Sequence, residues 1–185
     1  MVERNLPEFE YADHGRVQEL LDLLVYCFEG VSLSFDRWDE PYVKGPGLYV
    51  AVVAGTSVTP YADPMGDNRW PVGQCGNVFE DGSLFESAES VARETDGAVV
   101  VTVDGEIHEQ MVRFKYRPEQ VANGDVEYAD WMGSRHMSAA DTSARDEVVA
   151  ALTLSEETGR VSVFRDGSYE DYTRAELGGR WHSGG

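Results

Sequence analysis

The sequence predicts an α/β (α+β) fold in which a mixed, largely antiparallel central sheet is flanked by helices. Two segments repeat their apolar residues at helical spacing, and short runs rich in β-branched residues alternate with them. Some of these runs are followed by a turn signal and a second run, a pattern typical of antiparallel hairpins. Hairpins mixed with helices favour a mixed sheet covered by helices over a purely parallel one.

The first two predicted elements are a helix and a strand. Residues 14–30, "HGRVQELLDLLVYCFEG", repeat apolar side chains at helical spacing, and Gly30 is a typical residue for a helix to end at. Cys27 lies on the apolar face of this helix and, like Cys75, is predicted to be a free thiol, because neither C-x-x-C spacing nor a secretory context is present. Residues 47–55, "GLYVAVVAG", are apolar and rich in β-branched side chains, which predicts a buried strand.

An irregular stretch and a second helix are predicted next. Residues 56–82 carry three prolines among glycines and aspartates, so we expect no regular structure there. Residues 83–95, "SLFESAESVARET", predict a helix with Ser83 as its N-cap. Glu86 follows three residues later, which completes the sequence pattern of a capping box.

The first predicted hairpin follows the second helix. Residues 98–103 form a short apolar run, and Asp104-Gly105 is a strong signal for a two-residue turn. Residues 106–116 are therefore expected to return antiparallel to the run before the turn.

The second predicted hairpin ends the fold. Residues 147–154, "EVVAALTL", and residues 160–167, "RVSVFRDG", form its strands, joined by "SEETG". Between the two hairpins, residues 138–146, "SAADTSARD", are the best candidate for a short helix.

The length and the absence of a linker predict one domain spanning residues 1–185. Residues 1–83 are expected to be its N-terminal part, and residues 178–185 a frayed tail. No apolar run approaches the roughly 20 residues of a membrane helix. The N-terminal residues do not resemble a signal peptide, so we expect a cytoplasmic protein that does not contact membranes.

The charge balance excludes one class of partner. The chain has 15 basic and 34 acidic residues, a formal net charge of −19, and its only lysines are Lys44 and Lys115. So acidic a chain repels phosphate backbones, which argues against nucleic-acid binding. The composition resembles that of haloarchaeal proteins, which work in concentrated salt, where self-repulsion is largely screened.

Three short polar segments together predict a nucleotide site. Residues 96–98, "DGA", offer a carboxylate beside a glycine; residues 133–136, "GSRH", offer an arginine next to a helix start; residues 155–159, "SEETG", offer two carboxylates in a turn. Taken singly, each segment is as typical of an ordinary turn or helix cap as it is of a functional site. Together they could hold a metal ion on carboxylates and a polyphosphate on amides, hydroxyls and a guanidinium, which is what phosphoryl-type transfer needs.

In order and spacing, the three segments resemble the diadenylate cyclase (DAC, DisA_N-type) family. The family pattern is Asp-Gly-Ala on a strand, Gly-Thr-Arg-His-Arg before a helix and, in many members, a Ser-Glu-Glu-Thr-Gly turn. The segment "KYRPEQ" is also similar to the family's Tyr-Leu-Pro-Leu-Ser stretch, which would put Tyr116 by the adenine. The resemblance runs over about residues 84–167 and, with the composition, is greatest to the haloarchaeal diadenylate cyclases.

The chain departs from the family pattern at two positions. Ser134 replaces threonine and keeps the hydroxyl group, whereas Met137 stands where the second arginine is expected. Either the remaining Arg-His pair and the metal suffice, or another arginine, Arg145 or Arg160, replaces that charge, or the enzyme is weakened.

The resemblance implies that two ATP molecules are condensed into cyclic di-AMP with release of two pyrophosphates. The reaction would be metal-assisted attack of a ribose 3′-OH on the α-phosphate of the facing ATP, with Mn²⁺ or Mg²⁺ as cofactor. It implies Asp96, Arg135 and His136 as catalytic residues, and Asp96 and Glu157 as metal ligands. The residues it implies for ATP binding are Gly97, Ala98, Tyr116, Ser134, Arg135, His136, Ser138, Ser155, Glu156 and Glu157.

The resemblance also implies a partner. Two ATP-loaded copies of the domain would meet face to face during catalysis, either as a dimer or within a larger homo-oligomer. Two alternatives stay open at this point: a catalytically weak or inactive domain that senses ATP or a cyclic dinucleotide, and a structural or interaction protein that binds no nucleotide.

Overall fold

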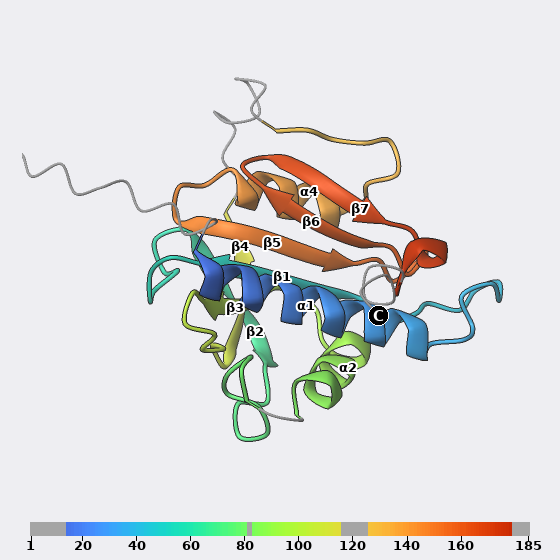
Figure 1. The fold of residues 1–185 in the computed structure, drawn as a ribbon, viewed down its shortest axis with the longest axis horizontal. Helices are drawn as coiled ribbons and strands as arrows, with labels where there is room; N and C mark the ends of the chain where they lie inside the picture. Colours follow the sequence, from blue (N-terminus) through green and yellow to red (C-terminus); the bar gives the residue numbers. More distant parts are fainter. Residues whose placement is uncertain (1–13, 81–82, 116–125, 179–185) are drawn as a thin grey trace, which may run out of the picture.

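The computed structural model describes residues 14–80, 83–115 and 126–178. Its central sheet has five strands in the order β3-β1-β5-β6-β7, and β2 pairs with β4 in a separate two-stranded sheet. The helices are α1 (Gly15–Ser34), α2 (Leu84–Glu94), α4 (Ser134–Ser143) and the 3-10 helix η2 (Arg174–Glu176). The strands are β1 (Leu48–Val53), β2 (Ala62–Arg69), β3 (Val99–Thr102), β4 (Gln110–Phe114), β5 (Val148–Leu154), β6 (Val161–Arg165) and β7 (Ser168–Tyr172) (Figure 1).

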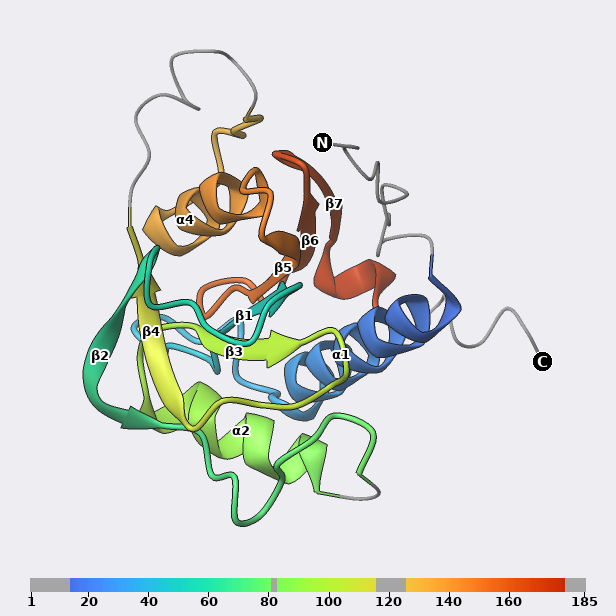
Figure 2. The same cartoon turned by 90° about the vertical axis from the view of Figure 1, so that its left-hand side faces the viewer.

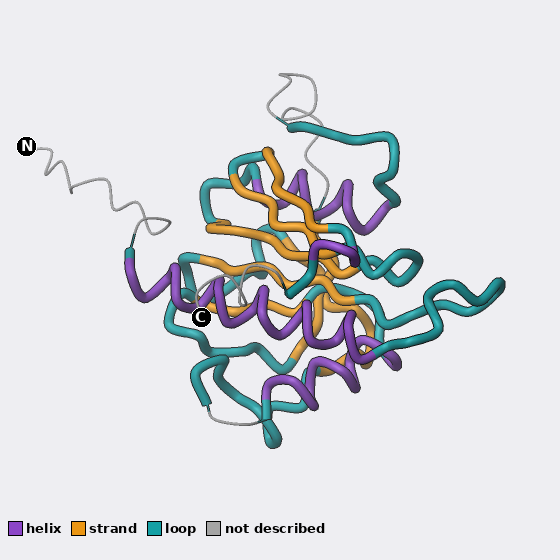
Figure 3. The backbone as a smooth tube through the Cα atoms, turned by 45° about the vertical axis from the view of Figure 1, so that its right-hand side comes forward, coloured by secondary structure: helices purple, strands orange, loops and turns teal. Residues whose placement is uncertain are grey.

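The predicted mixed, largely antiparallel sheet is confirmed. Strands β1 and β3 pair parallel, whereas β1–β5, β5–β6 and β6–β7 pair antiparallel. Helices α1 and α2 lie on one side of this sheet and α4 lies on the other (Figure 2). The tube in Figure 3 shows the same arrangement, with the strands between the two helical layers.

Alternation along the strands gives each side of the sheet its own core. Val50 and Leu152 belong to the cluster under α1 and α2, whereas their neighbours Tyr49 and Ala151 belong to the cluster under α4. Both clusters consist of buried side chains, which is expected because successive residues of a strand point to opposite faces. Cys27 is buried on α1, as predicted, and neither it nor Cys75 forms a disulfide.

The first helix is longer than predicted. It continues past Gly30 to Ser34, because Val31 and Ser32 are buried and extend its packed face. Gly30 serves a different purpose, since a Cβ there would lie 3.0 Å from the ring of Phe85 on α2. The glycine therefore lets the two helices approach each other and does not end the first.

Two predictions in the middle of the chain were wrong. Residues 56–82, expected to be irregular, contain β2. Its one proline, Pro64, is tolerated because the strand pairs only with β4 and its register shifts between Pro64 and Arg69. The capping box at α2 is also absent: Ser83 is the N-cap, but its side chain makes no capping hydrogen bond.

The predicted first hairpin forms only in part. The chain does turn at Gly105, whose φ is +85°, but β3 and β4 meet through isolated bridges such as Ala98–Val112. Strand β3 instead pairs with β1, and β4 pairs with β2. The second hairpin, β5 with β6, is confirmed.

Candidate active site

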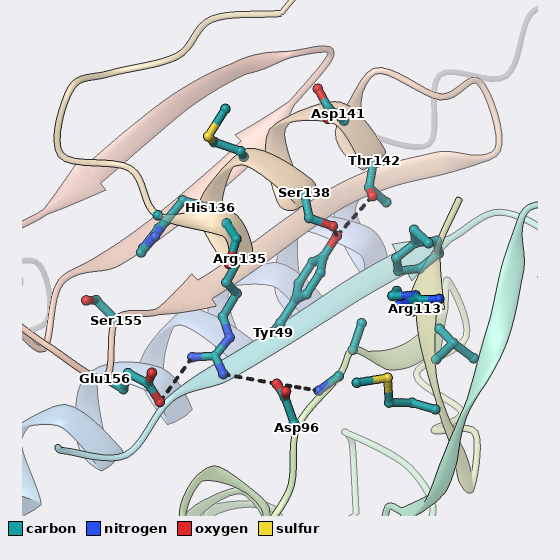
Figure 4. Close-up of a pocket in the computed structure, with 18 of the residues that line it drawn as sticks. Tyr49, Asp96, Arg113, Arg135, His136, Ser138, Asp141, Thr142, Ser155 and Glu156 are labelled. Carbon is teal, nitrogen blue, oxygen red and sulfur yellow. Dashed lines mark hydrogen bonds and ion pairs between the residues drawn. The ribbon is translucent and has the colours of Figure 1, made fainter. Parts of the chain in front are cut away.

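A pocket of about 760 Å³ lies between the start of α4, the segment before β3, strand β4 and the turn between β5 and β6. All three polar segments singled out in the sequence line it (Figure 4). The side chains and glycines that line it are Tyr49, Met65, Asp96, Gly97, Ala98, Val112, Arg113, Phe114, Lys115, Trp131, Gly133, Ser134, Arg135, His136, Met137, Ser138, Asp141, Thr142, Ser155, Glu156, Glu157, Thr158 and Arg160.

Asp96 reaches the pocket on a backbone turn that only a glycine accepts readily. Gly97 has a φ of +105°, and a Cβ there would lie 3.0 Å from the side chain of Met65. The Gly97 N–H donates to Asp96 Oδ1 at 2.9 Å, and Asn68 Nδ2 donates to the Asp96 carbonyl at 2.6 Å. These bonds fix the turn, while the Asp96 side chain stays 73% exposed and open to a ligand.

Helix α4 begins four residues earlier than predicted, at Ser134 with Gly133 as N-cap. Arg135 and His136 therefore lie in its first turn, where backbone N–H groups have no partner within the helix. No side chain caps this end, so its amides and the positive end of the helix dipole are available to an anion. The sequence did contain a signal for this earlier start, since glycine is one of the residues favoured at the N-cap position and Gly133 lies there.

One side of α4 presents hydroxyl groups to the pocket. Ser134, Ser138 and Thr142 are spaced by four residues and so share a face of the helix. Below them, the Tyr49 hydroxyl donates to Thr142 Oγ1 at 2.9 Å and lies 3.4 Å from Ser138 Oγ (Figure 4). Burial raises the pKa of Tyr49 to about 12, so the phenol remains protonated.

Arg135 joins the three polar segments. From the first turn of α4, its Nη2 lies 3.5 Å from Asp96 Oδ1 and its Nη1 lies 3.9 Å from Glu156 Oε2 (Figure 4). Gly47 makes room for it, because a Cβ at that position would lie 2.3 Å from Nη1. The guanidinium, 22% exposed, is thus held between one carboxylate from before β3 and one from after β5.

The turn after β5 is fixed by its own serine. The backbone N–H groups of Glu157 and Thr158 both lie 3.3 Å from Ser155 Oγ, and Gly159 has a φ of +73°. Glu156 Oε1 also lies 3.6 Å from Lys44 Nζ. The turn therefore holds Glu156 in a network of cations.

His136 is almost entirely buried, with 7% of its surface exposed, and its ring meets the edge of Trp131 at 5.1 Å between centroids. Its Nε2 atom has no hydrogen-bond partner among the described residues. Burial, followed by the charges of Arg135 and Arg160, lowers the pKa of His136 to about 4. At neutral pH the imidazole is therefore uncharged and can donate one hydrogen bond.

The pocket contains almost all of the site residues that the sequence predicts. Every residue predicted for catalysis, ATP binding or metal binding lines the pocket except Tyr116, which lies outside the described residues. Of the two arginines considered as replacements for a charge at Met137, Arg160 lines the pocket, whereas Arg145 is buried and donates to the Lys115 carbonyl. Their functional roles stay predictions.

Several lining residues carried no signal in the sequence. Tyr49 appeared only as part of a buried strand, and Arg113 and Lys115 as part of a hairpin that does not form as predicted. Trp131 precedes α4 in a segment with no periodic pattern. All four reach the pocket through strand pairing or helix packing, which local sequence does not specify.

The pocket offers few protein ligands to a metal. Within the three described ranges, no group of three or more His, Cys, Asp or Glu side chains lies close enough to hold an ion. Mg²⁺ and Mn²⁺ sites in phosphoryl-transfer enzymes, however, commonly use one or two carboxylates together with substrate phosphates and water. Asp96, exposed at the pocket wall, fits that type of shared site.

Comparison with known families decides what this pocket belongs to. Residues 78–169 match the family model described as "DAC: DisA bacterial checkpoint controller nucleotide-binding". This segment belongs to the DAC family. The match includes all three polar segments, and members of this DAC family are typically diadenylate cyclases that use divalent metals.

Two solved structures are similar to the chain. The chain is similar to the crystal structure of a hypothetical membrane spanning protein from Bacillus cereus, with a TM-score of 0.55 and 17% identity over 84% of this chain. It spans 64% of the length of that protein. It also matches DacA from Staphylococcus aureus, a double mutant, with a TM-score of 0.49 and 17% identity over 85% of this chain and 89% of that one.

Two further comparisons complete the description of the chain. None of the curated proteins matches it. In the described part of the chain, no helix is both long and apolar enough to span a membrane.

Proposed function

We propose that the chain is a diadenylate cyclase that condenses two ATP molecules into cyclic di-AMP and two pyrophosphates. The observation that carries the proposal is the position of Arg135, which contacts carboxylates of both other polar segments in one pocket. A phosphate group entering there meets a guanidinium, the first-turn amides of α4 and several hydroxyls, which together suit a polyphosphate.

We propose a role for each residue that its place in the pocket supports. Ser134, Arg135 and Ser138 bind the triphosphate and stabilise the departing pyrophosphate, whose charge grows in the transition state. His136, uncharged at neutral pH, donates a hydrogen bond to a phosphate oxygen. Gly97 and Ala98 let the ribose approach the main chain. The turn after β5 assists in binding ATP through Ser155, Glu156 and Glu157.

Asp96 would hold Mg²⁺ or Mn²⁺, with Glu157 as a second ligand. When bound, the ion lowers the pKa of a ligated oxygen and neutralises charge on the α-phosphate. Asp96 itself orients the ribose 3′-OH that attacks the α-phosphate of the facing ATP. Its exposure favours this role, because the side chain is free to turn from Arg135 towards a ligand.

The product has two phosphodiester links, so each ATP must attack the other. One pocket supplies one ATP, and we propose that a second copy of this domain, face to face with the first, supplies the other. Adenine would contact Tyr116.

The acidic composition suggests a working environment of concentrated salt, like that of the haloarchaeal proteins it resembles. We propose that salt screens the repulsion within a chain of net charge −19. Assays should therefore cover a range of salt concentrations.

The deciding assay is incubation of the pure protein with ATP and Mn²⁺ or Mg²⁺, followed by chromatography for cyclic di-AMP. We expect product from the wild type and a loss of at least about a hundredfold in Asp96→Ala. Asp104→Ala is a matched control, since Asp104 also precedes a glycine of positive φ but lies outside the pocket. It should keep full activity.

Two results would contradict the proposal. Tight ATP binding without any product would favour the alternative of a sensor domain, for which the apolar Met137 in the pocket wall is the motivating observation. Equal activity of Asp96→Ala and Asp104→Ala would remove Asp96 from the mechanism.

A further inference from the structure

Among the described residues, Arg160 is one of the three arginines that line the pocket, together with Arg135 and Arg113. It follows directly after the turn between β5 and β6. Its Nη1 lies 2.7 Å from Asp171 Oδ2, and its guanidinium carbon lies 4.1 Å from the centre of the Trp131 ring. An ion pair at one edge and an aromatic ring against one face fix the position and plane of this group.

Arg135 and Arg160, two of the three arginines that line the pocket, differ in the hydrogen-bond donors that their present contacts leave unused. Arg135 is shared between Asp96 and Glu156. Arg160 has one carboxylate, bonded through one nitrogen, and its Nη2 and Nε have no hydrogen-bond partner among the described residues. Because a guanidinium has five N–H donors, Arg160 keeps donors for a ligand while its position is fixed.

The surroundings of Arg160 favour an anion. His136 is packed against Trp131, and both Arg135 and Arg160 disfavour a proton on its imidazole. Burial is the main cause that lowers the pKa of His136, and the charges of Arg135 and Arg160 add to it; those two charges also attract a negative group into the space that these side chains line. The pocket lining has as many basic as acidic side chains, whereas the whole chain has 15 basic and 34 acidic residues.

We propose that Arg160 binds the triphosphate of ATP in this pocket, with Asp171 and Trp131 as its positioning residues. The inference rests on the proposed function for the identity of the ligand. Met137, which lines the same pocket and is 43% exposed, contributes no charge from α4, and Arg160 would supply a phosphate-binding cation from the segment after the β5–β6 turn.

The test separates phosphate from nucleoside binding. Calorimetry would measure the affinities of wild type and Arg160→Met for α,β-methylene ATP, from which pyrophosphate cannot leave, and for adenosine. We expect the affinity for the analogue to fall about tenfold and that for adenosine to change less than twofold, because only the phosphates lose a partner. Arg165→Met, at the other end of β6 and outside the pocket, is the matched control and should leave both affinities unchanged.

A rescue experiment distinguishes a charge effect from a structural one. In the Arg160→Met background, Met137→Arg places a cation in the same pocket from α4, and it should restore the affinity for the analogue to within about threefold of the wild type. Should Arg160→Met fail to fold, Arg160→Lys keeps the charge without the planar contacts and should weaken analogue binding by about threefold.

The outcomes are distinct from those of the cyclase assay, since binding is measured without turnover. A wild type that binds the analogue but makes no cyclic di-AMP would refute the proposed function and leave this inference standing. An unchanged affinity in Arg160→Met, a parallel loss of analogue and adenosine, or no rescue by Met137→Arg would overturn the inference.

Discussion

The two faces of the central sheet differ in the side chains that their strands bury. On the face covered by α1 and α2, the strand residues of the core are all valine, leucine or alanine. On the face covered by α4, a polar row crosses four strands, because Tyr49 pairs with Thr153, Thr153 with Ser162, and Ser162 with Asp171. Residues paired across strands share a face, so all four side chains point to the same side.

The polar row runs from the pocket to the carboxylate that holds one of its arginines. It begins with Tyr49, which lines the pocket beneath α4, and ends with Asp171, which holds Arg160. Between them, Thr153 Oγ1 and Ser162 Oγ are buried and have no hydrogen-bond partner among the described residues. Buried hydroxyls without partners cost about 1–3 kcal/mol each. The comparison therefore suggests that the face covered by α1 and α2 stabilises the fold, whereas the face covered by α4 is less stabilising because it carries the polar side chains of the site.

The largest expected effect is a loss of stability when the apolar face of the sheet is disrupted. Phe28 on α1 is 1% exposed and packs in the apolar core. Phe28→Ala should lower the free energy of unfolding by about 3–5 kcal/mol, because it removes buried surface and leaves a cavity. Urea denaturation measures the loss, and cyclase activity per folded molecule should stay near the wild-type value, since Phe28 does not line the active-site pocket. A loss of unfolding free energy below about 1 kcal/mol would contradict the idea that the apolar face provides most of the stability.

A smaller effect, with the opposite sign, is expected on the polar face. Thr153 is fully buried, and Thr153→Val replaces an unpartnered hydroxyl with a methyl group. The variant should unfold at the same urea concentration as the wild type or a higher one, with a gain of up to about 1 kcal/mol. Ser162→Ala, its cross-strand neighbour, is the companion variant. A clear loss of stability in both would indicate that these hydroxyls have a partner, such as a buried water.

The sequence predicted the polar segments of the site better than it predicted the elements that carry them. "DGA", "GSRH" and "SEETG" line one pocket as expected, because the chemistry of each segment is local. The polar row could not be predicted, since it depends on the register of β5 against β1 and β6. The same holds for Arg160, whose environment is made by Asp171 on β7, a strand that local sequence did not indicate.

The errors in the fold have a common physical cause. Gly30 was taken as a helix end and Asp104-Gly105 as the turn of a full hairpin, because each residue type favours that local structure. Tertiary packing decided otherwise: Phe85 packs against Gly30, and β1 rather than β4 forms the ladder with β3. Buried strands and long amphipathic helices, whose patterns span many residues, were predicted correctly.

The smallest effect concerns His136, the titratable side chain that α4 buries above the polar face. Its pKa falls from 6.5 to about 4 in the folded chain through burial and the charges of Arg135 and Arg160. Between these values the unfolded chain binds a proton that the folded chain does not, so the contribution of His136 to stability is complete above pH 6.5 and declines as the pH falls towards 4. Thermal unfolding between pH 7 and pH 4.5 should therefore decline less steeply for His136→Gln than for the wild type, because glutamine does not titrate. His108→Gln is the control, since His108 lies outside the pocket, and it should reproduce the wild-type slope. Identical slopes for wild type and His136→Gln would mean that the imidazole is protonated in the folded chain, and the positive potential around Arg160 would then be weaker than its contacts imply.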